Sequence, residues 1–166
     1  LAVFILSGCQ SAYRSHTKKM MEAYVAGDYV GAAVISKEGA DKQVKKRKDK
    51  VAYYLEAART AQVAGNVDDS IAMYDAVFED IRPYLDTKAE ATVTEGIATT
   101  AVNQAASVYK ATPGERVMFN TLNALNYLAV GDLDTARLEL NRAGDWQEDA
   151  VQRYSKEIEA AQKKAD

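Results

Sequence analysis

The chain has little of the residue types on which most active sites and metal sites depend. Its 166 residues include one His, one Cys and two Pro. With His16 as the single imidazole and Cys9 as the single thiol, neither a His-containing catalytic triad within the domain nor a Cys/His metal site is available. There is no GxxxxGK phosphate loop either. We therefore expect no catalytic residues, no metal and no cofactor, and we expect that the protein is not an enzyme.

Strong positive charge and long apolar runs are also missing. Lys and Arg number 21 against 24 Asp and Glu, and the pI is near 5.3, so the chain lacks the basic field of a nucleic-acid-binding protein. After Cys9 no apolar stretch approaches the roughly 20 residues of a transmembrane helix. What is abundant is Ala and other hydrophobic residues, 48% in all, in helical spacing. These features predict one all-α domain and exclude nucleic acid as the partner.

The first ten residues form a distinct segment. An apolar run, Leu1–Leu6, leads directly into Leu-Ser-Gly-Cys, ending at Cys9, and the first residue is not Met. This pattern indicates that residues 1–8 are the end of a signal peptide. An alternative is that residues 1–9 are a buried helix end with Cys9 as a small core residue.

The Leu-Ser-Gly-Cys sequence resembles the lipobox of bacterial lipoproteins. That resemblance implies that Cys9 carries lipid, that residues 9–12 are a short tether, and that the membrane is reached through the lipid. Because Gln10 rather than Asp follows the cysteine, it also implies the periplasmic face of the outer membrane.

Three segments of the chain share a glycine pattern: Gly, an apolar residue two positions later and a small residue five positions later. The glycines are Gly27, Gly65 and Gly131, and the small residues are Ala32, Ser70 and Ala136. Glycine suits the left-handed residue that ends a helix, the following Asp or Asn suits the start of the next helix, and a small residue permits close packing. Each segment is therefore predicted to be the turn of a helical hairpin.

The spacing and the residues around these turns resemble tetratricopeptide (TPR) repeats. The second unit has Tyr54, Ala58, Gly65, Ser70, Tyr74 and Pro83 in place, and the third has Ala124, Tyr127, Gly131, Ala136 and Ala143. The third departs from the family at Asn120 and Asn123, where large apolar residues are usual, and the first departs at His16 and Lys19. The stretch from Pro113 to Trp146 also resembles uncharacterised TPR-like lipoproteins. The resemblance implies that residues 13–166 form an α-solenoid of about eight helices.

Caps and breakers predict where these helices lie: 13–26, 29–40, 43–64, 68–82, 86–110, 113–130, 133–143 and 146–164. The start at Pro113 is marked by Thr112 as N-cap and Glu115 three residues later, and Asp145 with Glu148 repeats that logic. One buried apolar face is expected at Met118, Leu122, Leu125 and Ala129, and another at Trp146, Ala150, Tyr154, Ile158 and Ala161. Carboxylates are expected on solvated faces.

Candidate binding residues lie on the predicted helix 113–130. Asn120, Asn123 and Asn126 follow Glu115 and Arg116 along it. Grooves of TPR proteins often hold a peptide backbone with such side chains, because an amide both donates and accepts hydrogen bonds. The alternative is that these amides satisfy neighbouring helices or loops.

Two further features invite a binding role. A basic segment, which could meet anionic headgroups or an acidic partner, comprises Lys42, Lys45, Lys46, Arg47, Lys48 and Lys50. The predicted helix 86–110 is rich in Ala and Thr, and its small faces suit close approach of another helix. A solvated helix face and an internal spacer are the respective alternatives.

Together these observations favour a lipid-anchored scaffold or adaptor that binds another envelope protein or peptide. A peptidoglycan- or solute-binding lipoprotein remains open because the chain has ten Tyr, and a hydrolase would need a compact acid/base pair. The oligomeric state is left open.

Overall fold

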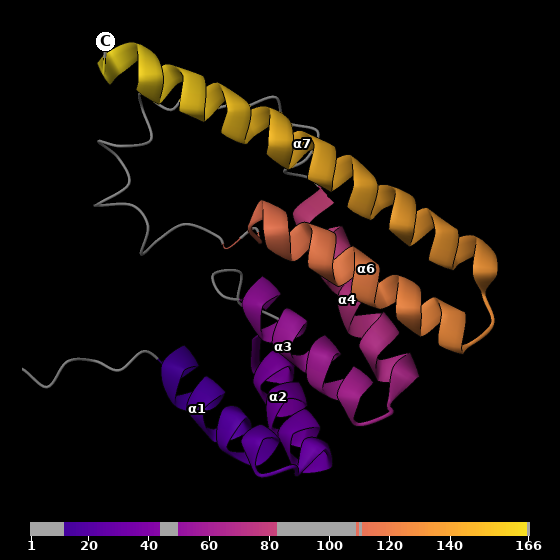
Figure 1. Ribbon diagram of the computed structural model, residues 1–166. Coiled ribbons are helices and arrows are strands. Elements are labelled where there is room, and N and C mark those ends of the chain that lie inside the picture. The colour runs from indigo at the N-terminus through magenta and orange to yellow at the C-terminus, as the bar shows by residue number, and fades with distance from the viewer. Residues whose placement is uncertain (1–11, 44–49, 83–108, 110, 166) are drawn as a thin grey trace, which may run out of the picture.

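The computed structural model describes residues 12–43, 50–82, 109 and 111–165, and in these residues it is helical, with no strand. Within these residues six helices follow one another: α1 (Ala12–Val25), α2 (Tyr29–Gln43), α3 (Lys50–Val63), α4 (Val67–Ile81), α6 (Pro113–Ala129) and α7 (Leu133–Ala165) (Figure 1). The predicted all-α class is confirmed. Cys9, the start of the tether and, apart from Tyr109, the predicted helix 86–110 lie outside the described residues.

The helices pair into three hairpins, α1 with α2, α3 with α4 and α6 with α7, and each hairpin turns on one of the predicted glycines. Gly27, Gly65 and Gly131 have φ of 82°, 82° and 83°, a left-handed conformation that favours glycine. After α6, the Asp132 amide donates to the Tyr127 carbonyl at 2.9 Å and the Gly131 amide to Leu128 at 3.2 Å. The same pair of bonds closes the other two turns, so the three helix ends share one capping motif.

The small residue five positions after each glycine is buried between the two helices of its hairpin. Ala32, Ser70 and Ala136 are 0%, 0% and 1% exposed. At this position Ser70 Oγ donates to the Ala58 carbonyl at 2.8 Å, which ties α4 to the backbone of α3. The sequence prediction of close packing at these positions is confirmed.

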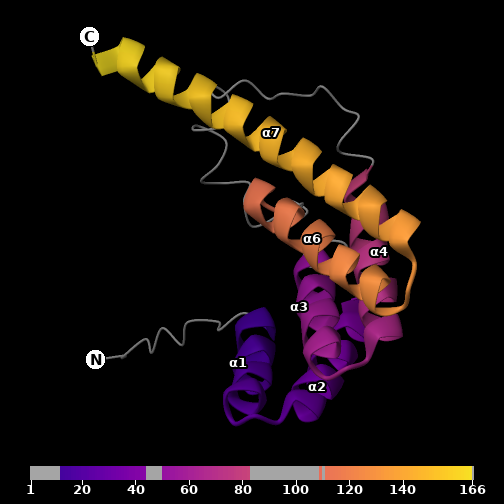
Figure 2. The same cartoon turned by 45° about the vertical axis from the view of Figure 1, so that its right-hand side comes forward.

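The hairpins stack in chain order. Each helix packs on the next one along the chain, α4 packs on α6, and α3 also touches α6 (Figure 2). The main core lies where α3, α4 and the start of α6 meet, and the Tyr74 and Phe119 rings stack there with centroids 6.3 Å apart. As a result, α1, α3 and α6 are neighbouring helices.

Helix α7 corrects two expectations. It runs without a break for 33 residues, so the predicted helix start at Asp145 is wrong, and its second half extends past the N-terminal end of the antiparallel α6 (Figures 1 and 2). A capping residue stabilises a helix start but does not impose one, and Gly144 costs a helix only about 1 kcal/mol. Beyond α6 the described residues offer α7 little to pack against, and Tyr154 is 56% exposed and Ala161 is also exposed instead of buried. Gln43, predicted to begin a helix, ends α2.

Candidate functional site

The three amides predicted to line an open groove lie inside the protein. Asn120, Asn123 and Asn126 are 0%, 1% and 1% exposed. They sit on the side of α6 that faces α3, α4 and α7. A buried amide must be hydrogen-bonded to avoid a large desolvation cost, so the partners of each amide decide its role.

Asn126 joins three helices. Its Nδ2 donates to Ser70 Oγ of α4 at 2.7 Å, and its Oδ1 accepts a hydrogen bond from Gln62 Nε2 of α3 at 2.7 Å. Gln62 Nε2 also donates to the Leu122 carbonyl at 2.9 Å. This chain of bonds fixes the crossing of α6 over the second hairpin.

Of the other two amides, Asn123 also bonds to the second hairpin, whereas Asn120 bonds within α6. Asn123 Nδ2 donates to Asp75 Oδ1 of α4 at 3.0 Å, and the Tyr127 hydroxyl donates to Asp75 Oδ2 at 2.9 Å, while Asn120 Nδ2 donates to the Arg116 carbonyl at 2.7 Å. Asn123 and Asn126 thus fit the alternative in which amides satisfy neighbouring helices, and the Oδ1 atoms of Asn120 and Asn123 have no hydrogen-bond partner among the described residues. Their side chains are not on an open surface, so the expected exposed row is corrected.

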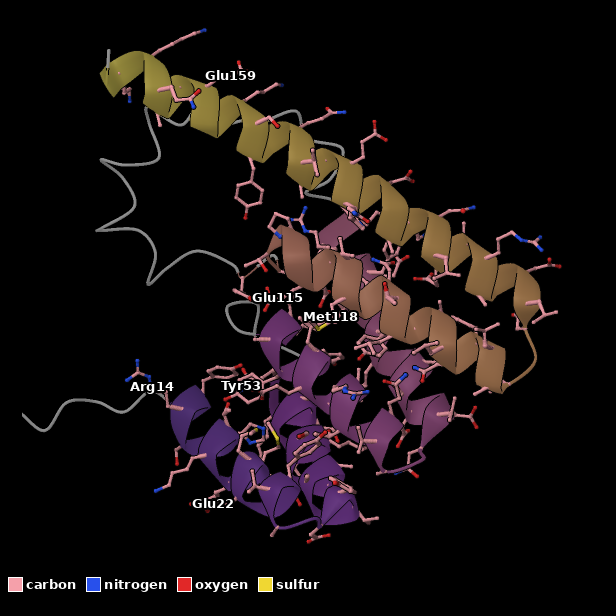
Figure 3. The ribbon with its side chains drawn as sticks, in the orientation of Figure 1. Arg14, Glu22, Tyr53, Glu115, Met118 and Glu159 are labelled. Atoms are coloured by element: carbon pink, nitrogen blue, oxygen red, sulfur yellow. The ribbon has the colours of Figure 1, made fainter. Side chains whose placement is uncertain are left out.

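Glu115 and Arg116 are likewise used within the chain. The Glu115 carboxylate accepts from the Thr112 amide at 2.6 Å, and the Glu115 amide donates to Thr112 Oγ1 at 3.3 Å, which completes the predicted capping box. The carboxylate also accepts from the Tyr109 hydroxyl. Burial acts to raise the pKa of Glu115, but these hydrogen bonds outweigh it and hold the pKa below its usual value. Arg116 lies over the Trp146 ring of α7 at 4.8 Å. Figure 3 shows Glu115 at the start of α6.

The apolar stripe of α6 that was predicted to be buried is largely exposed. Met118 and Leu125 are 61% and 52% exposed, Leu122 is half-buried and Ala129 is exposed. The sequence prediction that these residues form one stripe agrees with a helix, but the prediction that the stripe is buried is wrong. Figure 3 shows Met118 where α6 passes the end of α3 (Figure 3).

A pocket of about 310 Å³ opens beside this stripe. Four helices contribute to its wall, and the first helix of each hairpin does so. The lining residues are Met20, Met21 and Tyr24 from α1, Leu55, Glu56, Arg59 and Thr60 from α3, Tyr74 from α4, and Glu115, Met118, Phe119 and Leu122 from α6. We call this space the α1–α3–α6 pocket. Its wall is almost entirely apolar, with a few polar groups.

Glu56 is the main acidic group of this wall. Its Oε1 accepts hydrogen bonds from the Tyr13 hydroxyl at 2.9 Å and the Thr17 hydroxyl at 3.1 Å. Its Oε2 is buried and has no hydrogen-bond partner in the part of the chain that the structure describes. Burial raises the pKa of Glu56, and the two hydroxyl donors only partly oppose that effect. The wall of the pocket therefore includes a residue with one buried carboxylate oxygen that has no donor among the described residues.

Tyr74 supplies a second buried polar atom. The residue is 1% exposed, and its hydroxyl has no hydrogen-bond partner among the described residues. Burial raises the pKa of Tyr74, and the Arg59 guanidinium opposes this, which places the hydroxyl within the electrostatic reach of a residue that also lines the pocket. An apolar group with a polar tip would match such a wall.

Two carboxylates that are half-buried or buried, Glu56 and Glu139, were missed by the sequence reasoning, which expected carboxylates on solvated faces. Besides Glu56, Glu139 of α7 is 2% exposed and pairs with Arg142, whose guanidinium lies 4.1 Å from the Phe78 ring centroid. Burial raises the pKa of Glu139, with Arg142 opposing. Its position three residues after the predicted buried Ala136 was an available signal, since such residues share a helix face. For Glu56 we find no comparable signal.

The basic segment is only partly described. Lys42 is exposed, whereas Lys50 Nζ is paired with Asp80 Oδ2 at 2.7 Å and so does not belong to a free basic face. The four other cations of the segment lie outside the described residues. Among the described residues there is no group of three His, Cys, Asp or Glu positioned to hold a metal ion, and none of the helices there has the length and hydropathy to span a bilayer.

Comparison of the chain with protein-family models, with curated proteins and with solved structures gives no match. The function must therefore be argued from the pocket and the sequence.

Proposed function

We propose that this protein is a lipid-anchored envelope adaptor with a TPR-like solenoid of helical hairpins, and that it binds a segment of another envelope protein at the α1–α3–α6 pocket. In this proposal Cys9 carries the lipid, and residues 12–165 display the binding surface on the periplasmic face of the outer membrane.

One observation carries the binding part of the proposal: the pocket is lined by the first helix of every hairpin, α1, α3 and α6. Repeats that stack with a small rotation create a concave surface from equivalent helices, and such proteins use that surface for binding. The three turns with the same φ and the same capping bonds support the equivalence of the hairpins. The exposed Met118 and Leu125 extend the apolar surface beyond the pocket.

The anchoring part rests on the Leu-Ser-Gly-Cys sequence at the start of the chain. Each CH₂ of an acyl chain that enters the bilayer contributes about 0.8 kcal/mol, so two or more chains on Cys9 hold a protein at the membrane. The short distance from Cys9 to α1 would keep the pocket near the membrane surface.

A second candidate function is binding of a small apolar solute. The pocket volume of about 310 Å³ lies at the lower end of the range of roughly 300–1,000 Å³ for small-molecule sites. The two functions differ in what is recovered with the protein when it is extracted from the membrane. A crosslinked protein supports the adaptor, and an extractable small molecule supports the solute binder.

The adaptor function is tested by photo-crosslinking in cells. A crosslinking residue is placed at Met21 or Met118, beside the pocket, and in matched controls at Leu138 or Leu140, which are exposed on α7. We expect the same envelope protein to be captured from both pocket positions and from neither control. A Cys9→Ala chain, run in parallel, should leave the membrane fraction and lose the capture. Equal capture from all four positions, or none, would contradict the adaptor function.

A further inference from the structure

We propose that His16 is a pH-sensitive switch: in its neutral form it holds α1 against α2 and α3, and in mild acid it releases α1 and so opens one wall of the α1–α3–α6 pocket. The switch is a property of the chain alone. Its consequence, that a bound partner is released in mild acid, rests on the proposed adaptor function.

Helix α1 is the wall of the pocket that can move while the main core stays in place. It contributes Met20, Met21 and Tyr24 to the pocket, whereas the main core lies where α3, α4 and the start of α6 meet. Among the described helices, the backbone of α1 comes close only to that of α2, to which it is joined by the turn at Gly27. Movement of α1 about this turn therefore opens the pocket and leaves the second and third hairpins unchanged.

Side chains in the first half of α1 attach it to α3. The Tyr13 ring meets the Tyr53 ring edge-on, with centroids 5.1 Å apart, and the His16 ring lies 4.9 Å from Tyr53 (Figure 3). The hydroxyls of Tyr13 and Thr17 donate to Glu56. Because these few side chains connect the two helices, the loss of one contact weakens the whole attachment.

The His16 imidazole also fills a space on α2. Its Cε1 and Nε2 atoms lie 2.2 and 2.4 Å from the position that a Cβ on Gly39 would occupy. One edge of the ring is thus in direct contact with the backbone of α2, while Tyr53 of α3 lies beside the same ring. The imidazole therefore contacts both helices that α1 must leave when the pocket opens.

Protonation changes what this space has to accommodate. The Nε2 atom is buried and has no hydrogen-bond partner among the described residues. A neutral imidazole can leave Nε2 without a proton, whereas an imidazolium carries a proton on both ring nitrogens. In the closed position the cation would place an N–H group against Gly39 without an acceptor, which is costly. When α1 moves away, water can accept that hydrogen bond.

The charges around the ring also oppose the cation. Burial lowers the pKa of His16, Lys42 of α2 and Lys19 of α1 add to the lowering, and Glu38 of α2 opposes it. From α3, Tyr53 supplies a ring without a negative charge. Since the pKa in the closed state lies below the ordinary value of 6.5, the closed state is favoured above that pH, and this advantage is lost as the pH falls through the lowered pKa.

Glu56 is the other titratable group between α1 and α3, and its pH dependence has the opposite sign. Burial raises the pKa of Glu56, so acid favours the closed position of this residue. A protonated carboxyl group still accepts hydrogen bonds, so the bonds from Tyr13 and Thr17 persist. Acid therefore acts against the attachment of α1 through His16 and not through Glu56.

The switch is tested by hydrogen exchange of the backbone amides, followed by NMR and corrected for the intrinsic effect of pH. The whole chain is used, carrying Cys9→Ala so that it stays in solution. We expect the protection of α1 to fall by about threefold or more between pH 7 and pH 5, because a helix that leaves its neighbours opens to exchange. The amides of α6 are the internal control and should keep their protection.

Two pairs of variants separate the charge of His16 from other effects of acid. His16→Gln, which stays neutral, should lose no α1 protection at pH 5, whereas His16→Lys, which is charged at both pH values, should have low protection at both. Lys42→Gln should weaken the pH dependence, because it removes a charge that disfavours the imidazolium. Lys18→Gln is the matched control: Lys18 lies on α1 and is paired with Glu22, so the parent behaviour should persist.

Two results would overturn the inference: α1 protection that is the same at pH 7 and pH 5 in the parent chain, or an equal loss of protection in the parent and in His16→Gln. If His16→Lys fails to fold, the comparison of these two chains still decides.

The consequence for the partner is measured separately, by crosslinking from Met21 in isolated envelopes at pH 7 and pH 5. Capture should fall at pH 5 in the parent and persist in His16→Gln. If the adaptor function is wrong, no protein is captured at either pH while the pH-dependent protection of α1 remains. Capture that stays constant while α1 loses protection would show that the switch does not control the pocket.

Discussion

The two sides of α6 differ in what they present. Its buried side carries three amides, Asn120, Asn123 and Asn126, beside Phe119 and Ala124, whereas its outer side carries Met118 and Leu125, both more than half exposed. The buried amides are bonded to their own helix, to Ser70, to Gln62 and to Asp75. The outer apolar residues have no comparable set of partners. The inside of this helix is therefore adapted to specific pairing of hairpins, whereas the described residues do not cover the outside.

This contrast is informative because both sides carry a cost. Buried amides contribute only when each is paired, and they fix one geometry in return. An exposed apolar patch costs solubility and is typical of surfaces that another molecule covers. The buried side explains the fold, and the outer side is where we propose that a partner binds.

The largest expected effect comes from breaking the buried side. Asn126→Ala removes the donor to Ser70 and the acceptor of Gln62, and it leaves a small void. We expect a loss of unfolding free energy of about 3 kcal/mol, from two buried hydrogen bonds that are lost and from the void that remains. Urea unfolding followed by circular dichroism measures it. Asn141→Ala, at an exposed position of α7, is the control and should change stability by less than about 0.5 kcal/mol. A loss below about 1 kcal/mol at Asn126 would mean that the amide network does not hold the hairpins together.

The next effect concerns the first hairpin, where the imidazole of His16 fills the space that a Cβ on Gly39 would occupy. A Cβ on Gly39 of α2 would overlap the imidazole of His16 on α1, and that ring is confined by Tyr53, 4.9 Å away between centroids. We expect Gly39→Ala to destabilise the protein by about 1–2 kcal/mol, since overpacking outweighs the gain in helix propensity.

The same substitution in a His16→Ala background should change sign and stabilise by about 0.5–1 kcal/mol, because only the propensity gain remains. Gly144→Ala in α7, where an added Cβ meets nothing within 4 Å, should also stabilise. Thermal or urea unfolding of the four chains of this cycle measures both signs. If Gly39→Ala destabilises equally in both backgrounds, the clash with His16 is not the cause.

A smaller effect is expected from pH in the same place. Burial lowers the pKa of His16 below its ordinary value of 6.5, Lys42 and Lys19 add to the lowering, and Glu38 opposes it. The unfolded chain then binds the proton more readily, so the stability due to neutral His16 is present above pH 6.5 and is lost as the pH falls through its folded pKa. Glu56 and Glu139 have raised pKa values, so their contribution to stability depends on pH in the opposite way. It is present below about pH 4.5 and is lost as the pH rises through their folded pKa values.

The His16 contribution is isolated by comparing the parent with His16→Gln. We expect the parent to lose more of its melting temperature than the variant between pH 7 and pH 5. Parallel curves for the two chains would show that His16 does not titrate differently in the folded state.

The smallest effect on stability is expected on the outer side of α6. Leu125→Ala removes a side chain that is 52% exposed, so unfolding free energy should fall by no more than about 1 kcal/mol. Crosslinking of the partner from Met118 should nevertheless fall severalfold if the stripe is a docking surface. If Leu125→Ala instead caused a large loss of unfolding free energy and left crosslinking unchanged, the outer side of α6 would stabilise the fold and would not be the docking surface.

Local features of the fold could be predicted from the sequence because their causes are local. The turns at Gly27, Gly65 and Gly131 follow from the left-handed backbone that glycine adopts easily, and the capping box at Thr112 and Glu115 follows from two hydrogen bonds within four residues. The same reasoning failed at Asp145, because the helix continues through a residue that could have capped it.

The candidate site could not be predicted in the same way. The spacing of Met118, Leu122 and Leu125 shows that they share a face, but periodicity does not say whether a neighbour covers that face. Asn120, Asn123 and Asn126 were identified as a set from the sequence, whereas their burial depends on Ser70, Gln62 and Asp75, which are about fifty or more residues away in the chain. Glu56, on α3, lines the pocket because α1 and α6 flank that helix.

The sequence by itself determined the helical class, the three hairpin turns and the small residues that let each hairpin close, because these depend on backbone conformation and on neighbours within a few residues. Only the tertiary structure decided which side of α6 is buried, that Glu56 and Glu139 lie inside, and that α1, α3 and α6 enclose a pocket. The physical reason is that burial belongs to pairs of distant segments: a side chain leaves water only when another helix arrives beside it, and which helix arrives is settled by the packing of the whole chain.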